Sequence, residues 1–135
     1  MRPIKFRVKG RNNQWHYGYP LIYNDESFSF VDYEKLNDDR TPLELCTLEY
    51  VEDDTLGEFT GLHDKNGREI YEGDVVIDCE YGRYEVVYDS QYMRFAFRQG
   101  NINWGMEALF DGVCDCQVLG NKYDHPYLLD DGGEL

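Results

Sequence analysis

Residues 59–76 comprise Phe-Thr-Gly-Leu-His-Asp-Lys-Asn-Gly-Arg-Glu-Ile-Tyr-Glu-Gly-Asp-Val-Val, a stretch in which one turn joins two strands and a second turn starts a third. Residues 64–67 have the composition of a type I turn closed by a left-handed glycine, because Asp can accept backbone N–H bonds and Gly tolerates a positive φ. Residues 72–74 predict the second turn. The residues expected to have a structural role in these turns are Asp64, Asn66, Gly67, Gly73 and Asp74.

The segments on either side of the first turn have the pattern of half-buried strands. Residues 59–62 and 68–71 alternate apolar and polar side chains, so alternate residues face one side of a sheet. Phe59, Ile70 and Tyr71 are therefore predicted to contribute to the core.

The composition favours a mainly β protein. Aromatic residues make up 16% of the chain, and turn residues separate short segments rich in aromatic and branched side chains. We expect small antiparallel sheets or a barrel, with at most one or two short helices, for which residues 32–36, 106–110 and 123–129 are the candidates. Further strands are expected at residues 20–23, 28–31, 45–51, 74–80, 83–89, 91–98 and 116–121, with an acidic turn at residues 52–54.

The length of 135 residues suits one domain or two very small ones packed together. We predict an N-terminal β-rich region at residues 1–57, a C-terminal β module at residues 58–129 and a frayed acidic tail at residues 130–135, with halves that can interleave. No apolar run approaches the roughly 18 residues of a membrane helix, and no apolar signal-peptide core is found. A soluble cytoplasmic protein, without membrane contact, is expected.

The first predicted hairpin combines basic and aromatic residues. In residues 4–9 the alternation places Ile4, Phe6 and Val8 toward a core and the basic residues between them outside. The chain then turns at residues 10–13 and returns through an aromatic strand at residues 14–19. The candidate binding residues of this hairpin are Lys5, Arg7, Lys9, Arg11, Trp15 and Tyr17.

The charge distribution leaves several roles open for this hairpin. Residues 1–23 carry a net charge of +5 and residues 24–135 a net charge of -19, which together give the formal net charge of -14. The hairpin could stack bases and hold phosphates, it could simply pack within the protein, or it could dock on the acidic remainder within one chain or across subunits. The acidic remainder could instead imitate a phosphate backbone and block a DNA-binding protein. A net field this negative disfavours non-specific nucleic-acid binding by the whole surface.

Catalytic and metal-binding patterns are weak in this sequence. Cys114 and Cys116 would share a face of a strand and could form a zinc site with Cys79 and either His63 or His125, but only one closely spaced ligand pair is present. Reduced cysteines that pack as small apolar side chains are the better interpretation. His16, His63 and His125 lie far apart, and no phosphate loop or nucleophile turn is found. We expect no enzyme activity, no cofactor and no metal.

The chain resembles the YopX-like proteins, which are encoded mostly by bacteriophages and prophages. The resemblance rests on residues 4–7 (Ile-Lys-Phe-Arg), on residues 60–62, 64–67 and 70–76 of the central stretch, on residues 84–87, and on residues 118–123 with Pro126, Leu128 and Leu129. It covers nearly the whole chain. Where relatives tend to have a tryptophan and an acid soon after the first Phe-Arg, this chain has Lys9 and Gly10.

This resemblance implies an SH3-like barrel module in the C-terminal half, a tendency to self-associate and no established activity. The function predicted from the sequence is therefore a phage or prophage accessory protein that acts as a non-enzymatic, homo-oligomeric protein-binding module with an unknown protein partner. The alternative is a nucleic-acid role, either binding through the basic hairpin or acidic mimicry of DNA.

Overall fold

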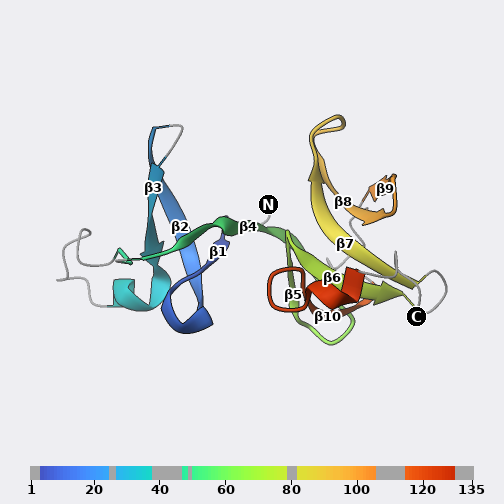
Figure 1. Ribbon diagram of the computed structural model, residues 1–135, viewed down its shortest axis with the longest axis horizontal. Coiled ribbons are helices and arrows are strands. Elements are labelled where there is room, and N and C mark those ends of the chain that lie inside the picture. Colours follow the sequence, from blue (N-terminus) through green and yellow to red (C-terminus); the bar gives the residue numbers. More distant parts are fainter. Residues whose placement is uncertain are drawn as a thin grey trace. The chain divides into compact units, whose positions relative to one another are not determined.

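The structure is a computed structural model that describes residues 4–24, 27–37, 47–48, 50–78, 82–105 and 115–129 (Figure 1). The chain divides into two compact units. The N-terminal unit comprises residues 3–58, and the C-terminal unit comprises residues 59–135 together with residues 1–2. The helical turn expected at residues 106–110 and the acidic tail lie outside the described residues. The strand expected at residues 45–51 is wrong for the part that is described (residues 47, 48, 50 and 51), where Thr47 forms an isolated bridge with Val31.

The N-terminal unit is built on a sheet with the strand order β3-β2-β1-β4. Its first elements are β1 (Phe6–Lys9), a 3-10 turn η1 (Arg11–Asn13) and β2 (Trp15–Asn24), and they form the predicted antiparallel hairpin. β3 (Ser27–Asp32) and the short 3-10 helix η2 (Tyr33–Asn37) follow. Thus the helical turn expected near residues 32–36 is present.

Close backbone approach and end capping shape this sheet. The Cβ of any larger residue at position 18 would lie 1.7 Å from the carbonyl oxygen of Val31, so only glycine fits between β2 and β3. At the end of β3 the carboxylate of Asp32 accepts the backbone N–H of Glu34 at 2.8 Å, which supports the start of η2. Val8, Phe30 and Val31 are fully buried in this unit.

The long strand β4 (Glu52–His63) belongs to both units, because the division falls between Glu58 and Phe59. Its first part pairs with β1, and its last part pairs with β5. The acidic turn predicted at residues 52–54 is wrong, since these residues begin the strand and Glu52 lies opposite Lys9 in the ladder. Tertiary pairing outweighs the low strand propensity of acidic residues here, and Asp53 and Asp54 remain exposed.

The C-terminal unit contains β5 (Glu69–Tyr71) and a second sheet with the order β10-β6-β7-β8-β9. The strands of this sheet are β6 (Asp74–Asp78), β7 (Gly82–Asp89), β8 (Arg94–Gln99), β9 (Ile102–Gly105) and β10 (Gln117–Asn121), and every pairing is antiparallel. The buried cluster at its centre is formed by Leu62, Ile70, Val76, Val86, Cys116 and Val118. Phe59, Ile70 and Tyr71 are buried as predicted.

The first turn of the central stretch has the predicted geometry. Gly67 has a φ of +84°, and its N–H donates to the carbonyl of Asp64 at 2.9 Å. One carboxylate oxygen of Asp64 accepts the backbone N–H groups of Asn66 and Arg68, both at 2.9 Å. The other accepts the N–H of Val118 on β10, also at 2.9 Å, a tertiary contact that no local pattern indicates.

The second turn is confirmed as well. Gly73 has a φ of +95°, and the carboxylate of Asp74 accepts the N–H of Tyr71 at 2.8 Å. The N–H of Gly73 donates to Val86 at 2.8 Å, and its carbonyl accepts the N–H of Lys122 at 2.9 Å. The turn therefore links β7 and the segment after β10 as well as reversing the chain.

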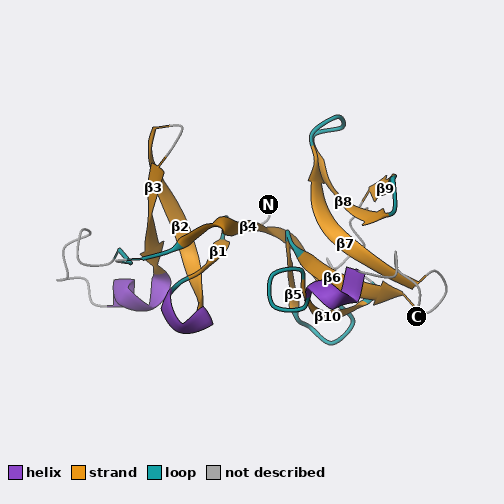
Figure 2. Cartoon of the chain, viewed as in Figure 1, coloured by secondary structure: helices purple, strands orange, loops and turns teal. Residues whose placement is uncertain are grey.

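The mainly β fold is confirmed, and among the described residues the helices are the short 3-10 elements η1, η2 and η4 (Pro126–Leu129) (Figure 2). The pairings of the described residues do not close into a barrel, because β9 and β10 each have a neighbour on one side. Tyr127 in η4 is 61% exposed. None of the described helices has the length and apolar character needed to span a membrane.

Candidate functional site

The structure brings three of the six candidate residues of the N-terminal hairpin together. The guanidinium of Arg7 lies over the indole of Trp15, 4.7 Å from the ring centroid, and the ammonium of Lys9 lies 6.0 Å from the same centroid. Both are within the range of a cation–π interaction. Tyr17 lies opposite Arg7 in the β1–β2 ladder, whereas Lys5 is half-buried before β1 and Arg11 is exposed in the turn.

The expectation that the basic side chains of β1 form an outer row is wrong for Arg7 and Lys9. Their relative exposures are 5% and 8%, while Ile4, which was expected to face a core, is 67% exposed. β1 is an inner strand between β2 and β4, and a register irregularity lies between Arg7 and Lys9. The long apolar stems of both side chains are therefore covered by neighbouring strands. The binding role of the hairpin stays a prediction.

A second polar group lies near this hairpin. His16 Nδ1 is 2.7 Å from the Asp32 carboxylate, at a small pocket of about 190 Å³ that Trp15, Tyr17 and Tyr33 help to line. The other edge of the imidazole faces Gly10, where an added Cβ would lie 2.9 Å from Cδ2 and Nε2. The pair ties β2 to the end of β3, and this packing gives His16 a structural role.

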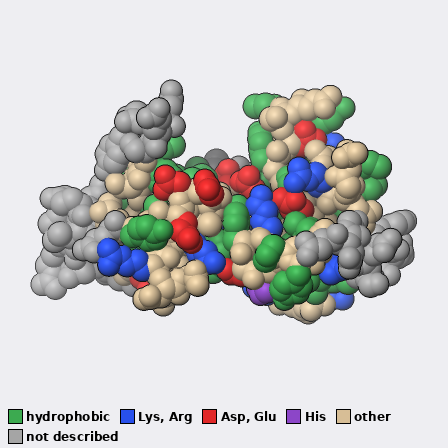
Figure 3. Space-filling view, in the orientation of Figure 1, with side chains coloured by type: hydrophobic (Ala, Val, Ile, Leu, Met, Phe, Trp, Pro, Cys, Tyr) green, Lys and Arg blue, Asp and Glu red, His purple; other side chains and the backbone are tan. Residues whose placement is uncertain are grey.

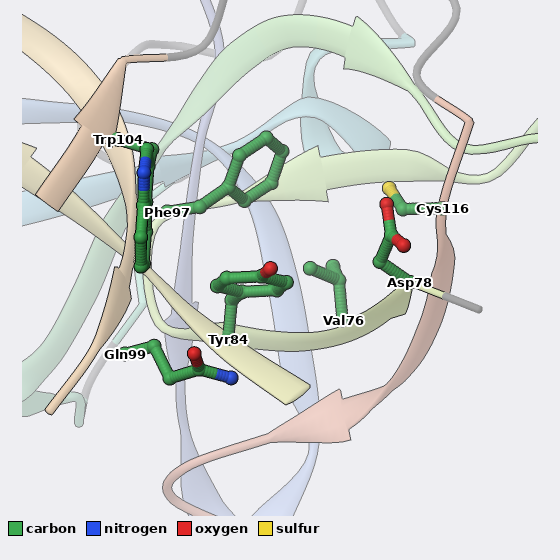
Figure 4. A pocket seen from close by; sticks show the side chains of 7 residues that line it. All are labelled: Val76, Asp78, Tyr84, Phe97, Gln99, Trp104 and Cys116. Atoms are coloured by element: carbon green, nitrogen blue, oxygen red, sulfur yellow. The ribbon is translucent and has the colours of Figure 1, made fainter. Parts of the chain in front are cut away.

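The larger candidate site is an aromatic pocket in the C-terminal unit. Its volume is about 510 Å³ (Figure 4). The described residues that line it, termed the aromatic pocket below, are Val76, Asp78, Tyr84, Phe97, Gln99, Trp104 and Cys116. They come from β6, β7, β8 and β9 and from the residue before β10.

Strand register explains why these residues share one face of the sheet. Val76 is paired with Tyr84 across β6 and β7, and Phe97 is paired with Trp104 across β8 and β9. Directly opposite residues in a ladder point to the same face, and so do residues two apart in one strand. Asp78 and Gln99 therefore lie on this face, two residues after Val76 and Phe97 respectively.

Three rings form the walls of the aromatic pocket. The centroid of Tyr84 lies 5.7 Å from that of Trp104, with an interplanar angle of 87°, and 5.9 Å from that of Phe97, with an angle of 54°. Figure 4 shows the Trp104 and Tyr84 rings as two walls at right angles. Phe97 lies above Tyr84, on the same side of Trp104. Tyr84 and Phe97 also pack on the buried cluster, whereas Trp104 is 45% exposed.

Polar groups lie toward the ends of the aromatic pocket. In Figure 4, Val76 lies between Trp104 at one end of the pocket and Asp78 and Cys116 at the other. Gln99 lies at the Trp104 end. The Gln99 amide donates to the carbonyl of Arg83 at 3.2 Å, which orients its side chain. A carboxylate and an amide among aromatic walls can fix the orientation of a ligand whose main contact is apolar or cationic.

The opposite face of β7 is ionic. Glu85 is buried and accepts a hydrogen bond from Arg98 at 2.7 Å, with the ammonium of Lys122 at 3.2 Å. Arg83 and Arg98 also line a shallow pocket of about 380 Å³ on this side. Glu85 pairs with both cations, so this face carries an ion-pair network in which one carboxylate balances one of the two positive charges.

Sequence reasoning missed the aromatic pocket. Residues 99–113 carry no clear alternation, so β9 and the position of Trp104 were not predicted. The signal that was available is the pair of alternating segments at residues 83–89 and 91–98, which places Tyr84 and Phe97 on defined faces. Only the β6–β7–β8–β9 register joins these two residues with Trp104.

The zinc hypothesis gains no support from the described part of the chain. Cys116 is buried, while Cys79 and Cys114 lie outside the described residues. Among residues that the structure describes, no group of three or more His, Cys, Asp or Glu side chains could hold a metal ion.

The fold and the aromatic pocket define a class of protein: an all-β chain of two small units whose C-terminal sheet forms a concave aromatic site on one face. The YopX protein family model matches residues 5–130, and the chain belongs to this family. The crystal structure of protein EF1440 from Enterococcus faecalis is similar, with a TM-score of 0.61, 21% identity, and coverage of 96% of this chain and 100% of that one. At this identity the likeness concerns the fold alone. No curated protein matches the chain.

Proposed function

We propose that this YopX-family chain is a non-enzymatic protein-binding module whose aromatic pocket receives a side chain from a partner protein. The observation that carries the proposal is the concave site formed by Tyr84, Phe97 and Trp104 on one face of the C-terminal sheet. Its volume of about 510 Å³ lies in the range of sites that enclose a ligand group, and its walls are rigid because two of the three rings pack on the buried cluster.

Exposed apolar side chains around the same strands support binding to a protein surface. Met93, Ile102 and Trp104 are 75%, 56% and 45% exposed, and Tyr92 is 61% exposed. Aromatic residues and methionine are enriched in the cores of protein interfaces. Figure 3 shows hydrophobic side chains at the surface beside acidic and basic ones, as in an interface that combines apolar contact with charge selection.

We also propose that the protein forms homo-oligomers and acts in the host cytoplasm as a phage or prophage product. The apolar residues of β9 support self-association, since β9 is the last strand of its sheet among the described residues and carries exposed Ile102 and Trp104. The phage origin and the compartment rest on the resemblance of the sequence to other YopX-like proteins.

The nucleic-acid roles are the alternative. The burial of Arg7 and Lys9 works against the hairpin version, because a phosphate would have to reach side chains that neighbouring strands cover. Acidic mimicry needs ordered carboxylates at the surface; Asp53 and Asp54 on β4 are exposed, but they are adjacent and therefore point to opposite faces. The aromatic pocket favours a protein partner over either role.

A display selection tests the proposed function. Random peptides would be selected on the full chain and then measured against Trp104→Ala and against Tyr127→Ala, a matched loss of an exposed aromatic residue elsewhere in the C-terminal unit. We expect enriched peptides that lose roughly tenfold or more in affinity with Trp104→Ala and keep their affinity with Tyr127→Ala. No enrichment, or enrichment that is equally insensitive to both substitutions, would refute a protein-binding role for the pocket.

A further inference from the structure

We infer that the side chain received by the aromatic pocket is an arginine of the partner protein. This inference rests on the proposed function, and it adds the chemistry of the ligand. The observations that carry it are the perpendicular aromatic walls, the carboxylate of Asp78 in the same pocket, and the negative charge of the unit that contains both.

The aromatic walls are suited to a flat cation. Tyr84 and Trp104 are at an angle of 87° with centroids 5.7 Å apart, so a group that stacks on one ring meets the face or edge of the other. The face of an aromatic ring is electronegative, and a cation within about 6 Å of its centroid is attracted to it. A guanidinium is planar and weakly hydrated, so it stacks on such faces with a smaller desolvation cost than an ammonium.

The same pairing occurs twice within this chain. The guanidinium of Arg7 lies 4.7 Å from the centroid of Trp15, and that of Arg94 lies 4.8 Å from the centroid of Tyr92. Arg7 and Trp15 come from neighbouring strands, and Tyr92 lies in the turn that precedes Arg94 on β8. These contacts give the distance expected between a partner's guanidinium and the Trp104 or Tyr84 ring.

Charge selects a basic ligand and directs it. Residues 59–135 contain 15 acidic and 6 basic residues, a net charge of -9, which attracts a cationic surface during approach. Within the aromatic pocket, the Asp78 carboxylate adds negative charge at the end beyond Val76, where it can accept an N–H of a guanidinium. Lysine would bring a point charge without this planar fork, so arginine fits both parts of the site.

Arg7 in the basic hairpin of a second copy is poorly placed to supply this arginine, which favours a residue of another protein. Arg7, the hairpin arginine nearest the aromatic strand, is 5% exposed and already stacked on Trp15 of its own unit. Removing it would forfeit that contact and uncover the ring. An exogenous arginine on a basic partner surface requires no such rearrangement.

A peptide titration on the full chain tests the inference. The probes are end-capped Ala-Ala-Xaa-Ala-Ala peptides in which Xaa is arginine, citrulline, lysine or leucine, and the signal is the indole N–H of Trp104 in nitrogen-15 NMR spectra, with Trp15 as an internal reference. Citrulline keeps the shape of arginine without its charge. We expect the arginine peptide to bind about tenfold more tightly than the citrulline peptide, with the lysine peptide between them.

Two variants and two controls locate the site. Trp104→Ala should abolish the response of the other pocket residues, and Asp78→Asn should weaken the arginine peptide about fivefold while leaving the leucine peptide unchanged. Tyr127→Ala and Asp53→Asn remove an exposed aromatic ring and an exposed acid outside the aromatic pocket and should leave all affinities as they are. Amide spectra of each variant would establish that it is folded.

The outcomes separate this inference from the proposed function. Equal affinity for arginine and citrulline, or tighter binding of leucine, would overturn the inference and leave the pocket as an apolar binding site. Binding of no peptide at millimolar concentration by a folded protein would also overturn it, and the display selection would then decide separately whether the pocket binds proteins at all.

Discussion

The carboxylate of Asp64 accepts a hydrogen bond from the backbone N–H of Val118 at 2.9 Å, which joins two residues 54 positions apart. The turn that contains Asp64 makes a second contact with the same segment, since the N–H of Lys65 donates to the carbonyl of Cys116 at 3.0 Å. Asp64 is 1% exposed. One buried carboxylate therefore closes the central hairpin and holds β10 against it, next to the aromatic pocket.

Replacement of Asp64 should destabilise the C-terminal unit strongly. Asp64→Ala would leave three backbone N–H groups without their acceptor, of which that of Val118 is buried, and we expect a loss of roughly 2–4 kcal/mol in the free energy of unfolding. Asp64→Asn keeps one oxygen but turns an amide toward a donor, so about 1–3 kcal/mol is expected. Chemical denaturation measures both losses. Asp53→Asn, at an exposed position, is the control, and an equally small effect at Asp64 would contradict the assigned role.

Acid should unfold the C-terminal unit through the same residue. Burial by itself would raise the pKa of the Asp64 carboxyl, but three backbone N–H donors and the charge of Arg68 outweigh burial and hold the pKa below its ordinary value. A lowered pKa in the folded state contributes stability that is present above the unfolded value of about 4 and is lost as the pH falls through the folded value.

The measurement for this acid effect is the free energy of unfolding between about pH 5 and pH 2, for the wild type and for Asp64→Asn. The wild type should lose stability more steeply than the variant, because the amide does not titrate. Parallel curves would show that other carboxyl groups account for acid sensitivity.

The two positive-φ glycines of the central stretch should differ in their tolerance of a side chain. Gly67→Ala meets no atom within 4 Å, so only the backbone strain at φ +84° applies, about 1 kcal/mol. Gly73→Ala adds a contact of 2.9 Å with the Tyr123 ring at φ +95°, and we expect at least twice that loss. Thermal unfolding of the two variants gives the comparison. A Gly73→Ala variant as stable as Gly67→Ala would argue against tight packing of Tyr123 on this turn.

Self-association should depend on β9. Light scattering is expected to give a defined oligomer whose mass is insensitive to salt, because exposed apolar residues of β9 rather than the buried Arg7 and Lys9 would form the contact. Ile102→Asp should lower the mass, whereas Ile22→Asp, at a similarly exposed isoleucine of the N-terminal unit, should not. A monomer at all concentrations would end the oligomer proposal, and dissociation by salt would favour an ionic interface.

The sequence by itself determined the features that depend on neighbouring residues. Asp64, Gly67, Gly73 and Asp74 form the predicted turns because side-chain acceptors and positive φ angles act over a few positions. The mainly β character and the burial of Phe59 follow in the same way, from alternation along single strands. The resemblance to YopX-like proteins rests on these same local motifs, and the family model agrees with it.

Only the tertiary structure decided which residues meet. Arg7 and Lys9 became buried because β1 has a neighbour on each side, a fact that alternation within one strand does not contain. The tie from Asp64 to Val118 and the meeting of Tyr84 with Trp104 depend on the order and register of strands distant in sequence. Pairing energies between strands are non-local, so they select one register among many that the local pattern allows. That selection creates the aromatic pocket.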